Sequence, residues 1–196
     1  MDLTQDFEKA KAAYDSHLAF VTQHRRKETW SAGHYFNIDP LDFQRAGLQQ
    51  GTLLKKKPSS TKQKYCYVFG EDEVLLQVCQ GLSLPNQFNE EFLFVEDGYS
   101  KSCLYGNNKS LINVKTKVFI DSRLKEVFLL GKLGSKHEQY FYENGILTHI
   151  EVNQWSGGQQ GASYTTFITY VEGLATEIIN RFDNGYSEVR YVAKNA

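Results

Sequence analysis

The sequence has no apolar run long enough to cross a membrane and no surplus of charge of one sign. No stretch of 18 consecutive apolar residues occurs, and this excludes a membrane-spanning helix of the usual length. The 22 Lys and Arg residues nearly balance the 23 Asp and Glu residues, so the net charge is −1. This balance gives no reason to expect a nucleic-acid partner or a membrane partner, and we expect neither.

Cysteine is also scarce. The three cysteines, Cys66, Cys79 and Cys103, are an odd number for a disulfide framework. Residues 1–27 carry charges throughout and contain no apolar core of a signal peptide. We therefore expect a cytoplasmic protein with free thiols. In the register of a four-residue turn at residues 70–73, Cys66 faces Gln77 and Cys79 lies diagonally on the same face. Two thiols at that spacing are either ordinary core residues or a pair that can bind a metal or oxidise.

The motifs of several enzyme classes are missing too. The sequence contains no G-x-S-x-G, no phosphate-binding G-x-x-x-x-G-K-[ST] and no C-x-x-C. His137-Glu138 begins like the zinc motif H-E-x-x-H, but position 141 is Phe. We therefore predict no catalytic residue, no metal site and no cofactor. The sequence favours a non-enzymatic protein, although an enzyme stays open.

What the sequence does contain begins with a helical N-terminal segment, residues 1–51. Over residues 3–23, apolar residues recur every three or four positions, which is typical of an amphipathic helix. This apolar stripe consists of Leu3, Phe7, Ala10, Tyr14, Leu18 and Val21. A shorter helix is predicted over 40–49, with Asp39 as N-cap, Pro40 in the first turn and Gly51 past the end. The lysine-rich residues 52–64 show no periodicity and predict a mobile loop.

From Tyr65 onward, apolar and polar residues alternate, and short turns separate the alternating runs. These turns include Asp97-Gly98, Asn144-Gly145, Glu172-Gly173 and Asp183-Asn184-Gly185. Asn, Asp and Gly tolerate the positive φ that tight hairpin turns require. Residues 65–196 are therefore predicted to form a long antiparallel meander of about ten strands.

The predicted fold class is α+β, mostly β, in a single domain over residues 1–196. The N-terminal helix packs on the meander, which forms a strongly curved sheet or a closed barrel. In the last hairpin, Asn184-Gly185 as the turn places Arg181 opposite Glu188, and these opposite charges support the pairing.

The hairpin over residues 138–152 supplies most of the candidate binding residues. With Asn144-Gly145 as its turn, Tyr142 faces Leu147, Tyr140 faces His149 and Glu138 faces Glu151, all on one side of the sheet. The other side carries the predicted core residues Phe141, Ile146, Ile150 and Val152. The first side is either a solvated ladder of tyrosines or the lining of a pocket or partner surface.

Residues 153–161 form a second candidate, predicted as a long loop that places Trp155 beside flexible glycines. Loops on a rigid sheet often carry binding residues, and Trp is frequent among residues that dominate binding energy. The alternative is a wide hairpin with Trp155 folded back over the core. The complete set of candidate binding residues is Trp155, Tyr140, Tyr142, His149, Glu138 and Glu151.

Two of the predicted hairpins, FYENGILTHIEV and RFDNGYSEVRYV, resemble the strand repeats of bacterial antitoxin proteins of the MORN-variant type. The resemblance covers roughly the last 60 residues, where the turn glycines are less evenly spaced than in that family. It implies a non-enzymatic protein that binds and neutralises a toxin. The leading helix and the long meander are also similar in layout to lipocalin-like barrels, which is a similarity of topology alone.

Three functions follow from these observations. The first is a cytoplasmic protein-binding domain, of the immunity or antitoxin type, whose partner is another protein such as a toxin. The second is a lipocalin-like barrel that binds a small apolar ligand as a carrier or a lyase. The third is an enzyme whose residues meet only in the fold, for example His149 with Glu138 and Glu151 around a cleft.

Overall fold

The computed structural model of the chain describes residues 2–96 and 98–194. Within these residues it contains helices α1 (Leu3–Lys11), α2 (Tyr14–His24) and α3 (Asp42–Arg45), and a short 3-10 helix, η1 (Glu71–Glu73). The strands are β1 (Lys27–Ala32), β2 (Thr52–Leu54), β3 (Lys64–Phe69), β4 (Leu75–Gly81), β5 (Phe88–Glu96), β6 (Tyr99–Tyr105), β7 (Leu111–Ile120), β8 (Arg123–Gly131), β9 (Gly134–Glu143), β10 (Ile146–Ser156), β11 (Gln159–Val171), β12 (Leu174–Phe182) and β13 (Ser187–Val192).

The strands follow one another as an antiparallel meander. Consecutive strands from β3 to β13 are neighbours in one 13-stranded sheet, and β1 lies between β3 and β2. The predicted meander is confirmed, but it has more strands than the ten expected. The two ends of the strand order are β13 and β2, and no ladder joins them within the described residues. The closed-barrel alternative is therefore wrong. Closure of a barrel requires the first and last strands of the sheet to pair, and β2 has only three residues available for such pairing.

The contacts divide the chain into two compact units, each with its own apolar core. Unit 1 consists of Met1–Tyr35, Gly51–Thr116 and Leu129–Lys132, and unit 2 consists of Phe36–Gln50, Lys117–Phe128 and Leu133–Ala196. The core of unit 1 includes side chains from α1, α2 and strands β1 to β7. The core of unit 2 includes side chains from β8 to β12.

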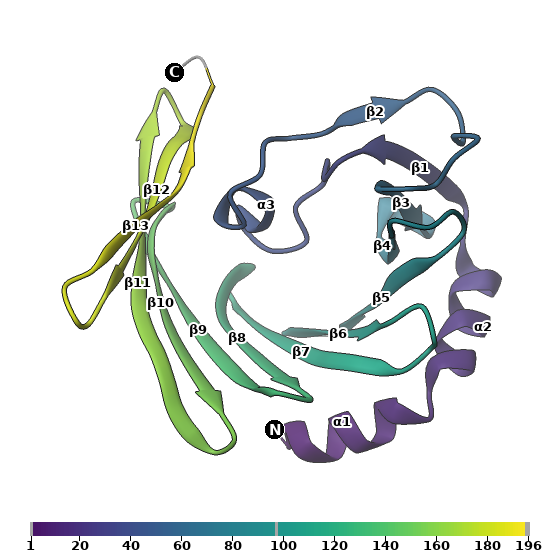
Figure 1. Cartoon of the computed structure of the whole chain (residues 1–196), viewed down its shortest axis with the longest axis horizontal. Helices are drawn as coiled ribbons and strands as arrows, with labels where there is room; N and C mark the ends of the chain where they lie inside the picture. Colours follow the sequence, from purple (N-terminus) through teal and green to yellow (C-terminus); the bar gives the residue numbers. More distant parts are fainter. Residues whose placement is uncertain (1, 97, 195–196) are drawn as a thin grey trace. The chain divides into compact units, whose positions relative to one another are not determined.

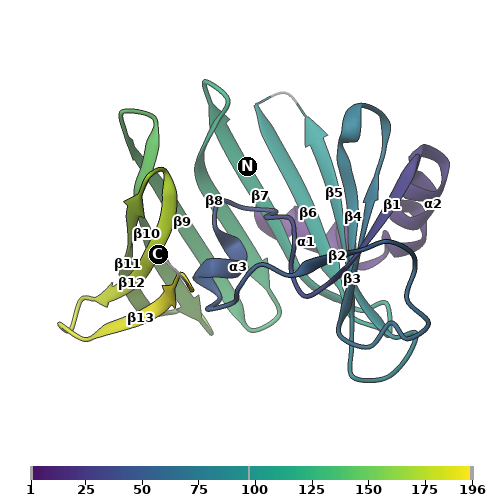
Figure 2. The same cartoon turned by 90° about the horizontal axis from the view of Figure 1, so that it is seen from above.

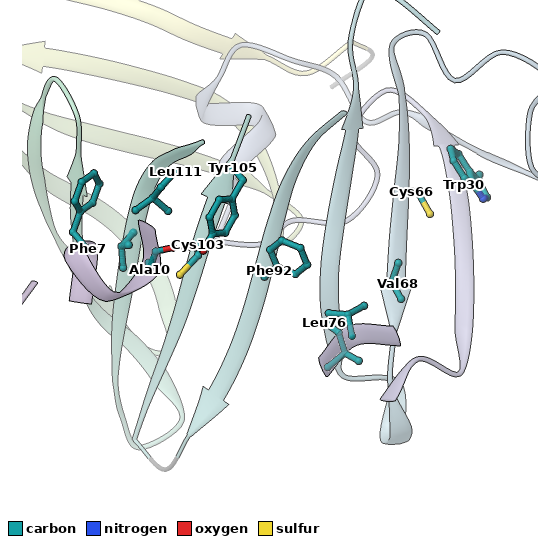
Figure 3. Packing of buried hydrophobic residues seen from close by; sticks show 12 residues of the cluster. Phe7, Ala10, Trp30, Cys66, Val68, Leu76, Phe92, Cys103, Tyr105 and Leu111 are labelled. Carbon is teal, nitrogen blue, oxygen red and sulfur yellow. Dashed lines mark hydrogen bonds between the residues drawn. The ribbon is translucent and has the colours of Figure 1, made fainter. Parts of the chain in front are cut away.

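In unit 1, the predicted helix over residues 3–23 is two helices, α1 and α2, which meet at a bend (Figure 1). Figure 3 shows Ala10 of α1 beside Cys103 and Tyr105. The hydroxyl of Tyr105 donates a hydrogen bond of 2.7 Å to the Ala10 carbonyl oxygen. A continuous helix would offer that oxygen to the N–H of Tyr14. Instead, the N–H of Ala13 donates to this oxygen at 3.1 Å, and the Tyr105 hydroxyl bonds to the same oxygen, so the helix breaks at a point that the apolar periodicity did not indicate.

The rest of the N-terminal segment also departs from the helical prediction. Residues 27–32 form β1, which pairs with β3 from Lys27 opposite Phe69 to Ala32 opposite Lys64. The partners are far apart in the sequence, so no turn marks the pairing. The predicted mobile loop over 52–64 begins with strand β2, which pairs with β1.

The helix predicted over residues 40–49 is reduced to the four residues of α3. Its N-cap is Leu41, with φ of 57°, rather than Asp39. It ends at Arg45, two residues before Gly47, whose φ is 78°. The N–H of Gly47 donates to the Gln44 carbonyl at 2.8 Å, and the N–H of Leu48 donates to the Phe43 carbonyl at 2.9 Å. Two such bonds around a glycine with positive φ are a common way for a helix to end. α3 therefore stops well before Gly51, the residue expected to follow it.

In unit 2, β9 to β12 lie side by side (Figure 2), and the hairpins predicted at Asn144-Gly145 and Glu172-Gly173 join β9 to β10 and β11 to β12. The turn residues Asn144-Gly145 have φ of 50° and 84°, and Glu172-Gly173 have 50° and 80°. Both hairpins then have a bulge three residues after the glycine, at Thr148 and Thr176, where the pairing register shifts by one residue. The Thr148 hydroxyl donates to the Phe141 carbonyl at 3.2 Å, and the Thr176 hydroxyl to the Thr169 carbonyl at 3.3 Å. A one-residue shift moves every later side chain to the opposite face.

The two remaining predicted hairpins are also present, and the loop of the last one is longer than expected. In the last hairpin, three residues rather than two form the loop, because the N–H of Phe182 bonds to the carbonyl of Tyr186. Glu188 therefore faces Asn180, and the predicted pairing of Glu188 with Arg181 is wrong. The hairpin between β5 and β6 is present, with Glu96 opposite Tyr99; Asp97 of its predicted turn lies outside the described residues.

Candidate functional site

The six candidate binding residues do not share one face of the sheet. Tyr142 faces Leu147 as predicted. Beyond the bulge at Thr148, however, Tyr140 faces Ile150, Glu138 faces Val152 and His149 faces Phe141. Ile150 and Val152 are core residues as predicted. The assignment of Phe141 and Ile146 to the core is wrong, since both are exposed to solvent.

On the buried face, Glu138 is the centre of an ionic cluster. Its side chain is 2% exposed. The Arg45 guanidinium of α3 donates to Oε1 at 2.6 Å, and the Lys136 ammonium lies 2.7 Å from the same oxygen. The Tyr140 hydroxyl donates to Oε2 at 2.6 Å. Burial by itself raises the pKa of Glu138, but the charges of Arg45 and Lys136 outweigh it and lower that pKa to about 2.

This cluster attaches residues 36–50 to the strands of unit 2. Arg45 bonds to Glu138 and, at 3.0 Å, to the Tyr140 hydroxyl, while its carbonyl oxygen accepts from Nε of Arg190 at 3.1 Å. A second buried pair, Lys117 with Asp39 at 2.5 Å, lies in the same unit. Glu138 is buried, and Arg45, Lys136 and Tyr140 occupy three of the roughly four acceptor sites of its carboxylate, so the cluster indicates a structural role.

On the exposed face, one side chain from each of β9 to β13 lines up in a single row. Phe141 faces His149, which faces Phe167, which faces Ile179, which faces Val189. Phe141 is 37% exposed, Phe167 is 38% exposed and Val189 is 58% exposed, whereas His149 and Ile179 are half-buried. We refer to these five side chains as the exposed row.

The rings of the exposed row stack on one another. The planes of Phe141 and His149 are 2° apart with centroids separated by 4.5 Å, and His149 lies 6.0 Å from Phe167. The Arg181 guanidinium lies 4.7 Å from the centroid of the Phe167 ring. Stacked rings and a cation over a ring face hold the side chains in one arrangement, so the surface is largely preformed.

A polar row lies directly beside the exposed row. Glu151 faces Gln139 on one side and Thr165 on the other, and Thr165 faces Arg181. Glu151 and Arg181 are exposed. An apolar strip bordered by hydrogen-bonding and charged groups has the composition of a protein-binding surface.

Trp155 lies on the same face as His149 and Glu151, but on a strand rather than in a loop. β10 continues to Ser156 and β11 begins at Gln159, so the predicted loop is a tight hairpin. Its turn residues, Gly157 and Gly158, have φ of 57° and 78°. Trp155 is half-buried and faces Gln160 and Ser135. Tyr142 lies on the buried face, with the Lys125 ammonium 5.3 Å from its ring centroid.

A recess of about 490 Å³ adjoins one end of the exposed row. Phe141, His149 and Thr148 contribute to its lining, together with Lys125 and Glu126 of β8. Its volume falls within the range of small-molecule and side-chain pockets. The bulge at Thr148 shapes this part of the surface, because it sets which side chains of β10 face outward.

Within the described residues, His149, Glu138 and Glu151 do not form the catalytic cluster that the enzyme hypothesis requires. His149 and Glu151 point to the exposed face, whereas Glu138 is buried on the other face of the same strands. In residues 2–96 and 98–194, no group of three or more His, Cys, Asp or Glu side chains is placed to hold a metal ion. None of the described helices is long and apolar enough to cross a membrane.

No family model matches the sequence, and no match was found among curated proteins or solved structures.

The sequence patterns did not indicate Phe167, Ile179 and Val189 as candidates, because these residues lie on strands outside the hairpin over residues 138–152. One sequence signal was available. GILTH and GLATE place Thr at the same offset after the turn glycine, which is where the bulges occur.

Proposed function

We propose that this protein is a non-enzymatic protein-binding domain whose partner docks on the exposed row of unit 2. The observation that carries the proposal is the alignment of Phe141, His149, Phe167, Ile179 and Val189 across five strands. Large contiguous apolar patches on a protein surface are typical of interaction sites, whereas scattered exposed apolar residues are not.

The chemistry of the surface indicates the class of partner. Aromatic side chains and Arg are enriched at the centres of protein interfaces, and Phe141, Phe167 and Arg181 supply them here. Unit 2 contains 8 Lys and Arg residues against 11 Asp and Glu residues, a net charge of −3. The partner is therefore a protein with an apolar patch and a positively charged rim, attracted by the acidic unit before the apolar contact forms.

The resemblance to MORN-variant antitoxins extends this proposal to a toxin as the partner. The hairpins of β9 to β13 support a toxin as the partner, because the same hairpins contain the residues that resemble those antitoxins and the side chains of the exposed row. A cytoplasmic setting belongs to the same proposal, and the free thiols of Cys66, Cys79 and Cys103 support it. The lipocalin-like alternative needs an enclosed barrel, and the strand order has two open ends.

The test uses the full chain as bait, followed by binding of the purified candidate partner. Replacing both Phe141 and Phe167 by Ser removes two aromatic contacts, each worth at least about 1 kcal/mol in a binding hot spot, so Kd should rise at least about 30-fold. The matched control replaces Val171 and Leu174, which are exposed at the end of the β11–β12 hairpin and lie outside the exposed row. The control variant should bind like the wild type.

Amide chemical-shift mapping locates the contact independently of the variants. Shifts should concentrate on the central residues of β9 to β13, and Glu151→Lys should slow association at low salt. The proposal is rejected if every partner that binds the purified chain contacts other strands, or if the Phe141 and Phe167 double variant binds as tightly as the control. Self-association through this face would also reject it, because the occupant would then be a second copy.

A further inference from the structure

Unit 1 contains a recess of about 210 Å³ at the bend between α1 and α2. Its apolar lining comes from Ala10 and Ala13 on the helical side and from Phe94, Cys103 and Val114 on the strands. The two alanines leave the space open where the helices diverge. Figure 3 shows the neighbouring wall, where Ala10 lies next to Cys103 and Tyr105.

The recess has the size and lining for a small aromatic ring. An apolar cavity of about 150 Å³ in a protein is sufficient to bind benzene. The rim is polar: the Lys101 ammonium and the Asp6 carboxylate pair at 2.9 Å, and Lys9 and Glu96 also line the opening. A ligand would therefore place its ring among the apolar residues and a polar group near the edge.

His17 supplies the polar feature of the interior. Its imidazole lies 4.6 Å from Phe94, centroid to centroid, and Nδ1 lies 3.2 Å from the Tyr105 hydroxyl oxygen. That hydroxyl already donates its proton to the Ala10 carbonyl, so its oxygen accepts from Nδ1–H. Nε2 of the neutral ring is then a hydrogen-bond acceptor, and the described residues provide it with no donor. Burial lowers the pKa of His17 and so favours this neutral form.

We propose that this recess binds a small aromatic molecule with one hydrogen-bond donor, such as a phenol, through a hydrogen bond to Nε2 of His17. The site is separate from the exposed row, and its ligand is independent of the partner proposed above. Ala10, Ala13 and Phe94 enclose the ring, while His17 selects ligands that carry an O–H or N–H group.

The test compares phenol with anisole, which has a similar ring but no donor. The wild type should bind phenol saturably and roughly threefold to tenfold more tightly than anisole, as expected for one net hydrogen bond. His17→Phe keeps an aromatic ring against Phe94 and should abolish this preference. Ala13→Leu fills the recess and should weaken both ligands. His24→Phe, at the last residue of α2 and outside the recess, is the matched control and should change neither affinity.

The ¹⁵N resonance of His17 Nε2 gives a readout that requires no variant. It should move when phenol binds and stay unchanged with anisole, because only phenol donates a proton to this nitrogen. Absence of saturable phenol binding would overturn the proposal. So would an equal affinity for phenol and anisole in the wild type, or a phenol preference that survives in a folded His17→Phe variant.

Discussion

Glu138→Gln should destabilise unit 2 by about 3 kcal/mol at pH 6. The substitution keeps the shape of the side chain and its contact with the Tyr140 hydroxyl, but it removes the charge that faces Arg45 and Lys136. The pKa of Glu138 falls from an ordinary value of 4.5 to about 2 in the folded chain. At about 1.4 kcal/mol for each pKa unit, this difference gives about 3 kcal/mol of stability from the ionised group. Breaking a buried ion pair has a cost of the same order.

The pH dependence has a definite sign. Because folding lowers the pKa of Glu138, the unfolded chain takes up the proton first as the pH falls. The contribution is complete above the unfolded pKa of about 4.5 and is lost as the pH decreases toward 2. The difference in stability between the wild type and Glu138→Gln should therefore shrink on acidification, with about 2 kcal/mol lost by pH 3.

The assay is urea unfolding followed by the amide resonances of β9 to β12, which report on unit 2 alone. With a slope of about 2 kcal/mol per molar urea, the transition midpoint should fall by about 1.5 M at pH 6. Glu143→Gln is the matched control, since Glu143 is exposed on the same strand, and it should shift stability by less than about 0.5 kcal/mol. A difference below about 1 kcal/mol for Glu138→Gln, or one that does not decrease in acid, would refute the assignment of Glu138 as a buried, charged anchor.

Three other predictions follow from the packing. Deleting Thr148 removes the unpaired residue and leaves a regular ladder with unchanged partners, so Ile150 and Val152 should stay buried, β10 should keep its amide protection, and the loss should stay below about 1 kcal/mol. Gly81→Ala should destabilise unit 1 by about 2 kcal/mol or more, because its Cβ would overlap the Thr61 carbonyl oxygen; thermal unfolding measures this. Cys66, whose pKa is raised to about 12 by burial, should react with iodoacetamide at pH 8 at least about 100-fold more slowly in the folded chain than in urea.

Each of these predictions has a control and a contradictory result. Deleting Glu151 instead, where the ladder is regular, would turn Val152 outward and should cost at least about 2 kcal/mol, so an equal effect of the two deletions would contradict the assignment of the bulge to Thr148. Gly106→Ala meets its nearest atom, Oδ1 of Asn108, at 3.3 Å, and it should be better tolerated than Gly81→Ala. Rapid alkylation of folded Cys66 would show that the thiol is accessible and contradict its burial.

The candidate binding residues illustrate why the register could not be obtained from one hairpin. A regular ladder from Asn144-Gly145 places Tyr140 opposite His149, whereas the structure places Tyr140 opposite Ile150. Both registers are compatible with the turn at Asn144-Gly145. The register with the bulge at Thr148 is more stable because it buries Leu147, Ile150 and Val152 on one face. An unbroken ladder would place these three side chains on two different faces.

The N-terminal helix shows a similar limit. The apolar stripe over residues 3–23 correctly indicated helix and a buried side, and Phe7, Ala10 and Val21 are buried. At the break between α1 and α2, the Ala10 carbonyl accepts from the N–H of Ala13 and from the hydroxyl of Tyr105, which comes some 90 positions later in the chain. No pattern within the helix contains that information.

The cysteines give a third case. The expected four-residue turn placed Cys66 opposite Gln77. Phe69 instead pairs with Leu75, one residue further than that turn implies, and the register shift between Val68 and Phe69 adds one more, so Cys66 lies directly opposite Cys79. The thiols are free and belong to, or pack against, the core of unit 1.

The sequence by itself determined where the chain reverses and that an antiparallel meander follows. A tight turn is decided by local φ preferences of residues such as Asn144, Gly145 and Gly173, and alternation of apolar residues marks a strand. Tertiary structure alone decided the register, the helix break and the row of exposed side chains. Those features depend on which groups, distant in sequence, bond to the same backbone atoms, and on which face of each strand is covered by other side chains. A short stretch of sequence contains neither piece of information.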